Sequence, residues 1–252
     1  MFNLNLCKKN LSTDVFGKLI KYYPKLDSTN TKACELITKN VKNGTVVITE
    51  NQTKGRGRQA NKWDSTQGKS LTFSIILYPN VIPKQINLYS LVAGLAITDC
   101  LIDFNIHAQL KWPNDVLIKG EKCGGILCES KISGGVIKSM VIGIGLNVNE
   151  DIADLPPELR NKVTSLQIER RKQYQLEILL ANILNHLENR INSNDETQLL
   201  DWEKRCAHLN KKVTFHSGNE SITGVFKGLT SSGQAIIAIN YEEVAFDSGE
   251  IV

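Results

Sequence analysis

Residues 108–148 read AQLKWPNDVLIKGEKCGGILCESKISGGVIKSMVIGIGLNV and form a strand-rich block. Short runs rich in Val, Ile and Leu alternate with turn signals at 113–114, 120–121 and 134–135. Runs of this length separated by Pro or Gly turns are typical of strands joined by hairpins. We therefore expect consecutive antiparallel hairpins in this part of the chain.

The sequence on either side of the block indicates an α+β protein. Residues 45–49 and 70–78 predict two further strands, and 86–104, 173–191 and 197–207 show the apolar spacing of helices. From about residue 211 the chain changes to short β runs separated by Gly and Ser, which is typical of a small barrel. We expect a mixed or antiparallel sheet with flanking helices, followed by a small C-terminal β-barrel.

Composition excludes several classes of protein. The 252 residues are 41% hydrophobic and 22% charged, as in an ordinary globular protein, and the net charge of +4 is too mild to demand nucleic acid. The most apolar helical stretch, 88–101, is interrupted by Ser90, Thr98 and Asp99, so we predict no membrane span, no signal peptide and a cytoplasmic location. Six scattered cysteines without a C-x-x-C pair argue against zinc or a disulfide framework.

The loop TKGRGRQ at residues 53–59 concentrates positive charge after a predicted strand. Its glycines let backbone N–H groups approach an anion, and Arg56 and Arg58 can each donate paired hydrogen bonds to phosphate or carboxylate. A flexible, exposed basic turn would explain the same letters. RNA or DNA binding is disfavoured because no Arg-Gly repeat and no interleaved aromatic residue extends the loop.

The stretch KWPND at 111–115 places polar groups at a strand end, which its proline marks. Lys111 offers a charge for phosphate, Asn114 can orient its neighbours, and Asp115 is a candidate Mg²⁺ ligand. Taken alone, the stretch is better explained as a capped strand end with a packed Trp112.

Two glycine-containing stretches follow. In KCGGILCE, residues 122–129, paired glycines inside a strand indicate either close approach of a ligand or a β-bulge, and Lys122 stands at the strand start. In GIGLNVN, residues 143–149, the third glycine and the helix of a dinucleotide-binding fingerprint are missing, so a Rossmann interpretation is rejected.

In this order, the stretches resemble biotin–protein ligases, also called biotin–[acetyl-CoA-carboxylase] ligases. The matching residues are DSTN at 27–30, Gln52 with GRGRQ at 55–59 and Trp63, KWPND at 111–115, KCGGILCE at 122–129 and GIGLNVN at 143–149. The resemblance covers almost the whole chain. It implies a class II synthetase-like catalytic domain over residues 1–207 and an SH3-like domain over 208–252. It further implies that biotin and MgATP form biotinyl-5′-AMP, which then acylates a lysine of a biotin carboxyl carrier protein.

The resemblance assigns roles to individual residues. The implied catalytic residues are Arg58, Lys111 and Lys122. The implied biotin-binding residues are Ser28, Thr29, Asn30, Gln52, Arg56, Gly57, Arg58, Lys122 and Gly125. The implied nucleotide-binding residues are Arg58, Trp63, Lys111, Asn114 and Asn147, and Asp115 is the implied Mg²⁺ ligand. Biotin's own carboxylate is the first nucleophile, so charge neutralisation and positioning are needed rather than a Ser-His-Asp or Cys-His set.

Three features qualify the resemblance. Bifunctional members carry an N-terminal winged helix-turn-helix of about sixty residues, whereas DSTN begins here at residue 27, so we expect a ligase without DNA binding. Some members place a tryptophan over adenine where this chain has Val163. Both monomers and dimers occur in the family, which leaves a homodimer open.

A lipoate or octanoate–protein ligase or transferase is the nearest alternative, and GRGRQ and KWPND favour biotin over it.

Overall fold

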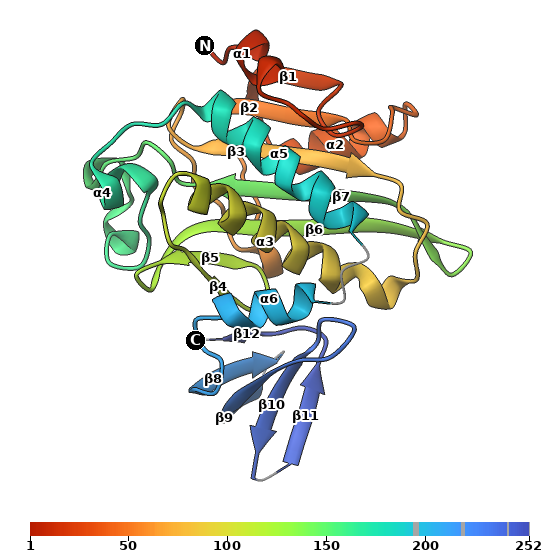
Figure 1. Cartoon of the computed structure of the whole chain (residues 1–252), viewed down its shortest axis with the longest axis vertical. Coiled ribbons are helices and arrows are strands. Elements are labelled where there is room, and N and C mark those ends of the chain that lie inside the picture. Colours follow the sequence, from red (N-terminus) through yellow and green to blue (C-terminus); the bar gives the residue numbers. More distant parts are fainter. Residues whose placement is uncertain (194–196, 218–219, 241, 252) are drawn as a thin grey trace.

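The computed structural model describes residues 1–193, 197–217, 220–240 and 242–251. Positions 218–219, 241 and 252 of the predicted C-terminal domain lie outside the described residues. The described chain forms a seven-stranded mixed sheet with helices on both faces and, below it in Figure 1, a five-stranded antiparallel sheet. The expected α+β fold is confirmed.

The larger sheet has the strand order β1-β2-β3-β7-β6-β5-β4. β1 runs parallel to β2, and every other neighbouring pair is antiparallel. The consecutive hairpins expected for 108–148 are present, with positive φ at Gly120, Gly134 and Gly135 making their turns. The strands are β1 (Ile20–Leu26), β2 (Val46–Gln52), β3 (Leu71–Leu77), β4 (Gln109–Lys111), β5 (Asp115–Ile118), β6 (Glu121–Ser133) and β7 (Val136–Leu146).

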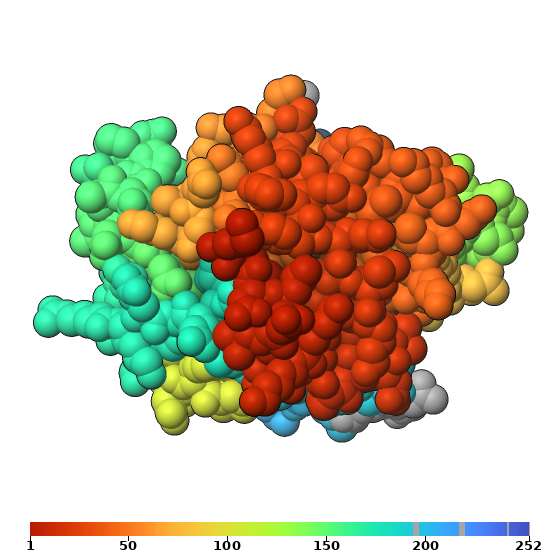
Figure 2. Space-filling model, turned by 90° about the horizontal axis from the view of Figure 1, so that it is seen from above, coloured from red at the N-terminus to blue at the C-terminus, as the bar shows by residue number. Residues whose placement is uncertain are grey.

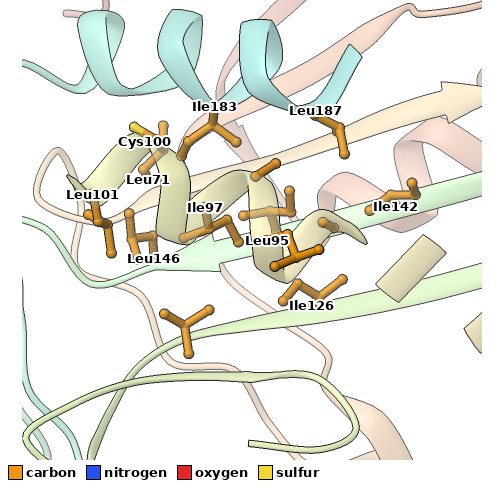
Figure 3. Close-up of a cluster of buried hydrophobic side chains, with 14 of the residues drawn as sticks. Leu71, Leu95, Ile97, Cys100, Leu101, Ile126, Ile142, Leu146, Ile183 and Leu187 are labelled. Atoms are coloured by element: carbon orange, nitrogen blue, oxygen red, sulfur yellow. The ribbon is translucent and has the colours of Figure 1, made fainter. Parts of the chain in front are cut away.

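Helices α3 (Ile86–Asp103) and α5 (Leu176–Asn192) cover one face of this sheet. Figure 3 shows their apolar side chains meeting those of the strands, among them Ile97, Ile142 and Ile183, which are at most 2% exposed. The helical stretch Pro83–Asp103 is long and apolar enough to cross a membrane. Because it lies between the sheet and α5, we assign it as a core helix.

Helix α2 (Thr29–Ile37) packs on the opposite face of the sheet through a smaller apolar cluster, formed by Ala33, Leu36, Val47, Ile76 and Val141. Successive residues of a strand point to opposite faces. Thr72 and Ser74 of β3 therefore share the face of Ile76, and Gly143 and Gly145 of β7 share that of Val141. One end of this face carries apolar side chains, and the other end carries small or polar residues.

The N-terminal segment, with α1 (Leu4–Lys9), covers the end of the molecule farthest from the C-terminal sheet (Figure 2). The buried Glu188 of α5 accepts hydrogen bonds from the backbone N–H groups of Asp14, Val15 and Phe16. Three donors on one carboxylate fix this segment to the core.

After β7, residues 149–170 form the 3₁₀ turns η3 (Ile152–Asp154) and η4 (Pro157–Leu159), then helix α4 (Leu166–Arg170). None of these short elements was predicted from the sequence. Helix α6 (Gln198–Arg205) leads to the second sheet, of order β11-β10-β9-β8-β12. Its strands are β8 (Lys212–Ser217), β9 (Glu220–Leu229), β10 (Ala235–Ile239), β11 (Glu242–Phe246) and β12 (Glu250–Ile251).

Trp112 joins the two sheets. It is fully buried, donates a hydrogen bond from Nε1 to the Gly233 carbonyl at 3.1 Å, and lies 5.8 Å from Phe215 between ring centroids. The packed tryptophan considered for KWPND is therefore present, together with a strand end that faces a cavity.

Candidate active site

A cavity of about 830 Å³, open to solvent, lies over the polar end of the α2 face. Its floor follows one rung of hydrogen-bonded partners across the sheet. The rung runs Thr49, Thr72, Gly145, Gly125, Asp115 and Lys111, and all of these except Thr49 line the cavity. The two central glycines have no side chain, so they leave a trough above the backbone, and the Trp63 ring lies over this trough at Gly145.

The start of α2 forms one wall of this cavity. Thr29 donates its backbone N–H to Gln52 Oε1 at 2.9 Å, and its hydroxyl lies 2.7 Å from Ser74 Oγ. Ser28 is the N-cap residue, but its side chain makes no capping hydrogen bond. Ser28 is buried and lines the cavity.

Asn30 is fixed by three contacts. Its amide nitrogen donates to the Leu127 carbonyl and to Glu129 Oε2, and its Oδ1 lies 2.6 Å from Ser74 Oγ. A Cβ at Gly143 would overlap Asn30 Oδ1, so glycine is required there for Asn30 to reach the sheet.

The glycine-rich loop is held over the cavity by paired cations. Lys54 pairs with Asp27 at 3.1 Å, and Arg56 with Glu129 at 2.7 Å. Gly57 donates its N–H to the Asn61 carbonyl, which closes the loop.

Arg58 departs from the exposed turn considered for this loop. It is partly buried, and burial lowers the pKa of its guanidinium. Its Nη1 donates to the Gly249 carbonyl at 3.2 Å, so the C-terminal sheet completes this side of the cavity.

Lys122 and Asp115 form an ion pair in the cavity, with Nζ and Oδ1 2.6 Å apart. The ladder between β5 and β6 shifts register next to Lys122, and Gly124 lies so close to the Gly145 carbonyl that a Cβ would be 3.1 Å away. The bulge interpretation is therefore confirmed, with Cys123 as the extra residue, and Gly125 lines the cavity, where the approach of a ligand stays a prediction.

Lys111 and Asn114 also border the cavity. Lys111 pairs with Asp115 across the ladder, and Asn114 donates from Nδ2 to the Ile126 carbonyl at 2.8 Å. Asn114 thus orients the β5–β6 hairpin, one of the roles expected for it.

Trp63 separates this cavity from a second one. Its ring lies against the trough, because a Cβ at Gly145 would be 2.6 Å from Cζ2. The second cavity, of about 960 Å³ including open solvent, is also lined by Trp63 and Lys122. Asn147 borders it and donates from Nδ2 to the Thr164 carbonyl, and Val163 forms part of its wall. The structure therefore brings every predicted site residue to one or both of two adjoining cavities.

Several residues of the site were missed from sequence. Thr72 and Ser74 occupy alternate positions of a predicted strand, and two hydroxyls on one face of an apolar strand were a usable signal. Glu129 lies inside the quoted KCGGILCE, but only the folded chain brings it to Asn30 and Arg56. Gly249 carried no sequence signal, since its contact is made by its carbonyl.

The donor set suits charged, phosphate-bearing ligands more than a resident metal. Within the described ranges no three His, Cys, Asp or Glu side chains gather as a metal cluster. Asp115 is a carboxylate in the main cavity, and Mg²⁺ in phosphoryl chemistry needs only one or two carboxylates besides the phosphates. The residues therefore fit a metal ion that arrives with a nucleotide.

Comparison with known proteins identifies the family. The model of the biotin/lipoate A/B protein ligase family matches residues 22–147, and that of the biotin protein ligase C-terminal domain matches 208–252. The bifunctional ligase/repressor BirA of Bacillus subtilis is 31% identical over 235 residues, covering 91% of this chain and 72% of that protein. This chain belongs to the biotin/lipoate A/B protein ligase family.

Other members of the family extend the match. The biotin–[acetyl-CoA-carboxylase] ligase of Paracoccus denitrificans is 30% identical over 220 residues, covering 84% of this chain and 90% of that protein. The structure of the Aquifex aeolicus biotin protein ligase in complex with biotin and ATP superposes with a TM-score of 0.79 at 30% identity, covering 93% of this chain and 98% of that one. The resemblance drawn from the motifs is confirmed.

Proposed function

We propose that this chain is a biotin–[acetyl-CoA-carboxylase] ligase, which activates biotin with ATP and transfers it to a lysine of a biotin carboxyl carrier protein. The observation that carries the proposal is the pair of cavities that adjoin at Lys122 and Trp63, in a chain of this family. One cavity has a glycine floor for a flat ring, and the other has room for a nucleotide.

In the first step, a carboxylate oxygen of biotin attacks the α-phosphorus of ATP. A P–O bond forms, and pyrophosphate leaves with the electrons of the bond that breaks. Lys122 and Arg58 are proposed to neutralise the negative charges that meet here, which is supported by the ion pair of Asp115 with the Lys122 ammonium at 2.6 Å and by the contact of Arg58 with the Gly249 carbonyl. The polar atoms of Ser28, Thr29, Asn30 and Gln52 are proposed to bind the ureido ring, beside Gly57 and Gly125.

In the second step, a neutral lysine amine of the carrier attacks the acyl carbon of biotinyl-5′-AMP. The C–N bond forms, the bond to the AMP oxygen breaks, and the amine loses a proton. The loop of Arg56 and Arg58 closes one side of the cavity, which limits access of water to the anhydride.

The cofactor and context of the reaction are proposed as well. Mg²⁺ bound to the ATP phosphates would add positive charge, with Asp115 as its protein ligand and Lys111 beside it.

A cytoplasmic location follows from the use of ATP and a carboxylase subunit. Nucleic-acid binding is not proposed, because no Arg-Gly repeat and no interleaved aromatic residue extends the basic loop. A homodimer stays a prediction.

The test is a pair of assays on the purified chain. With biotin, ATP and labelled pyrophosphate, we expect exchange of label into ATP. With a carrier domain added, we expect one biotinyl group on one lysine. Competition between biotin and lipoate at equal concentration tests the alternative, since preferential use of lipoate would reassign the substrate. Salt-sensitive DNA affinity that rivals biotin affinity would argue for a nucleic-acid-binding protein.

A further inference from the structure

Glu150 has an unusual position for an acidic residue that no step above uses. It follows GLNVN, is 2% exposed and lines the second cavity. Burial raises the pKa of its carboxyl group, while a hydrogen bond from Ser70 and backbone N–H groups oppose the rise. An acidic side chain this deeply buried needs partners for both oxygens.

Only one of its two oxygens is engaged by another side chain. Ser70 Oγ accepts the Thr66 N–H at 2.7 Å, so its single proton is directed to Glu150 Oε1. The backbone N–H groups of Val148 and Glu150 also act on this carboxyl group, but among the described residues no donor meets Glu150 Oε2 in hydrogen-bond geometry, and this oxygen is buried. The bond from Ser70 therefore fixes which oxygen is left to accept from a ligand.

The rest of the cavity fits a planar, partly polar group. Leu155, Pro156 and Val163 supply apolar walls, and Trp63 supplies an aromatic one. Trp63 Nε1 is also buried and lacks a partner in the described part of the chain. A ligand that offers both donors and acceptors on an aromatic frame would satisfy these groups.

We propose that Glu150 reads the nucleobase, with Oε2 accepting a hydrogen bond from the exocyclic amino group of adenine. The inference rests on the proposed use of ATP and adds a residue that determines nucleotide specificity. A carboxylate oxygen only accepts, and the amino group at C6 is the strong donor of the adenine ring. At that position, inosine and guanine carry a carbonyl oxygen, which a carboxylate repels.

Pyrophosphate release in the presence of biotin tests this proposal, with ATP and purine riboside triphosphate, which lacks the amino group, as the two substrates. The wild type should prefer ATP in kcat/KM by about ten- to hundredfold, the range of a hydrogen bond to a charged group. In Glu150→Gln, the Ser70 hydroxyl donates to the amide oxygen, so the amide NH₂ faces the base. The ratio of kcat/KM for ATP to kcat/KM for purine riboside triphosphate should then fall to about one. Inosine triphosphate should improve in the variant, because the NH₂ can donate to its carbonyl.

A matched control is Glu158→Gln, which removes an acidic residue from the exposed turn η4 and should keep the wild-type ratio. Equal use of both nucleotides by the wild type, or an unchanged ratio in Glu150→Gln, would overturn the proposal. If the wild type uses ATP and purine riboside triphosphate equally well but uses 2′- or 3′-deoxy-ATP with a lower kcat/KM than ATP, Oε2 binds the ribose and the base assignment is wrong. Pyrophosphate release from ATP by the wild type tests the proposed function separately, because the proposal concerns only the ratio between nucleotides.

Discussion

At the scale of single residues, Lys122 lines both cavities and forms an ion pair with Asp115. We predict that Lys122→Ala lowers biotin-dependent pyrophosphate exchange at least about tenfold, because a charge-assisted hydrogen bond contributes about 1.5–3 kcal/mol. The free energy of unfolding should fall by about 1–3 kcal/mol, because the lysine side chain is 36% exposed but its partner Asp115, which is 15% exposed, loses its ion pair.

The matched control for this variant is Lys131→Ala, which removes an exposed lysine from the same strand and should leave exchange unchanged. Thermal unfolding of both variants separates the two effects. Normal exchange in Lys122→Ala together with a collapsed melting temperature would make Lys122 a structural residue.

The two arginines of the glycine-rich loop are expected to retain the adenylate by different contacts. Arg56 is tied to Glu129, whereas Arg58 is partly buried against the Gly249 carbonyl. We predict that Arg56→Ala and Arg58→Ala each raise leakage of biotinyl-AMP by roughly one to two powers of ten, without unfolding the protein. Arg58→Lys should restore charge but not the paired donors, so recovery should be partial. Release of the adenylate at the wild-type rate in both alanine variants would contradict the prediction.

At the scale of elements, the trough depends on the glycines of β7. A Cβ at Gly145 would be 2.6 Å from Trp63 Cζ2, so Gly145→Ala must displace the Trp63 ring or the strand. We predict at least about tenfold weaker biotin and ATP binding, measured by isothermal titration. Because Trp112 and Trp202 are fully buried, a changed tryptophan emission of the variant would report mainly on Trp63. Unchanged affinity and emission would show that the trough tolerates a methyl group.

Elements with strong local signals could be predicted from sequence, and those defined by distant contacts could not. The hairpins of 108–148 and helix α3 follow from apolar periodicity and from glycines with positive φ. Helix α4 has five residues, too few for a periodic pattern, and depends on a cap in which Ser165 Oγ accepts the Ile168 N–H. The parallel pairing of β1 with β2 depends on packing rather than on a local turn.

The candidate site shows the same division. Its charged motif residues were predicted through the resemblance to a family, because each stretch taken alone also fitted an exposed turn, a strand end or a β-bulge. The burial of Arg58 was not predicted, because the carbonyl that it meets belongs to Gly249, far along the chain. Glu150 was not singled out either, since only the fold shows that one of its oxygens is left without a partner.

At the scale of the whole molecule, His208 lies at the junction of the two sheets. Its ring is 6% exposed, stands edge-on to Phe226 at 4.3 Å between centroids, and lies 6.3 Å from Trp202 of α6. Burial, with smaller contributions from Lys111 and Lys211, lowers the pKa of His208 from 6.5 to about 4. The neutral ring is therefore the form that the folded junction accommodates.

This lowered pKa makes the junction sensitive to acid. Between pH 6.5 and about 4 the unfolded chain binds a proton at His208 that the folded chain does not, so stability falls as the pH is lowered through this window. The loss is on the order of 3 kcal/mol and ends below pH 4, where both states are protonated. Above pH 6.5 both states are neutral and this contribution is constant.

We predict that His208→Phe, which keeps an aromatic ring in the junction but cannot be protonated, flattens the dependence of the free energy of unfolding on pH between 4 and 6.5. Urea unfolding at half-unit pH steps measures the slope for wild type and variant, and His107→Gln, at an exposed position, is the control that should keep the wild-type slope. Because the C-terminal sheet also supplies the carbonyl that holds Arg58, loosening of the junction by acid should weaken adenylate retention in the wild type more than in His208→Phe. Identical slopes in wild type and His208→Phe would show that protonation of His208 does not govern the joint between the sheets.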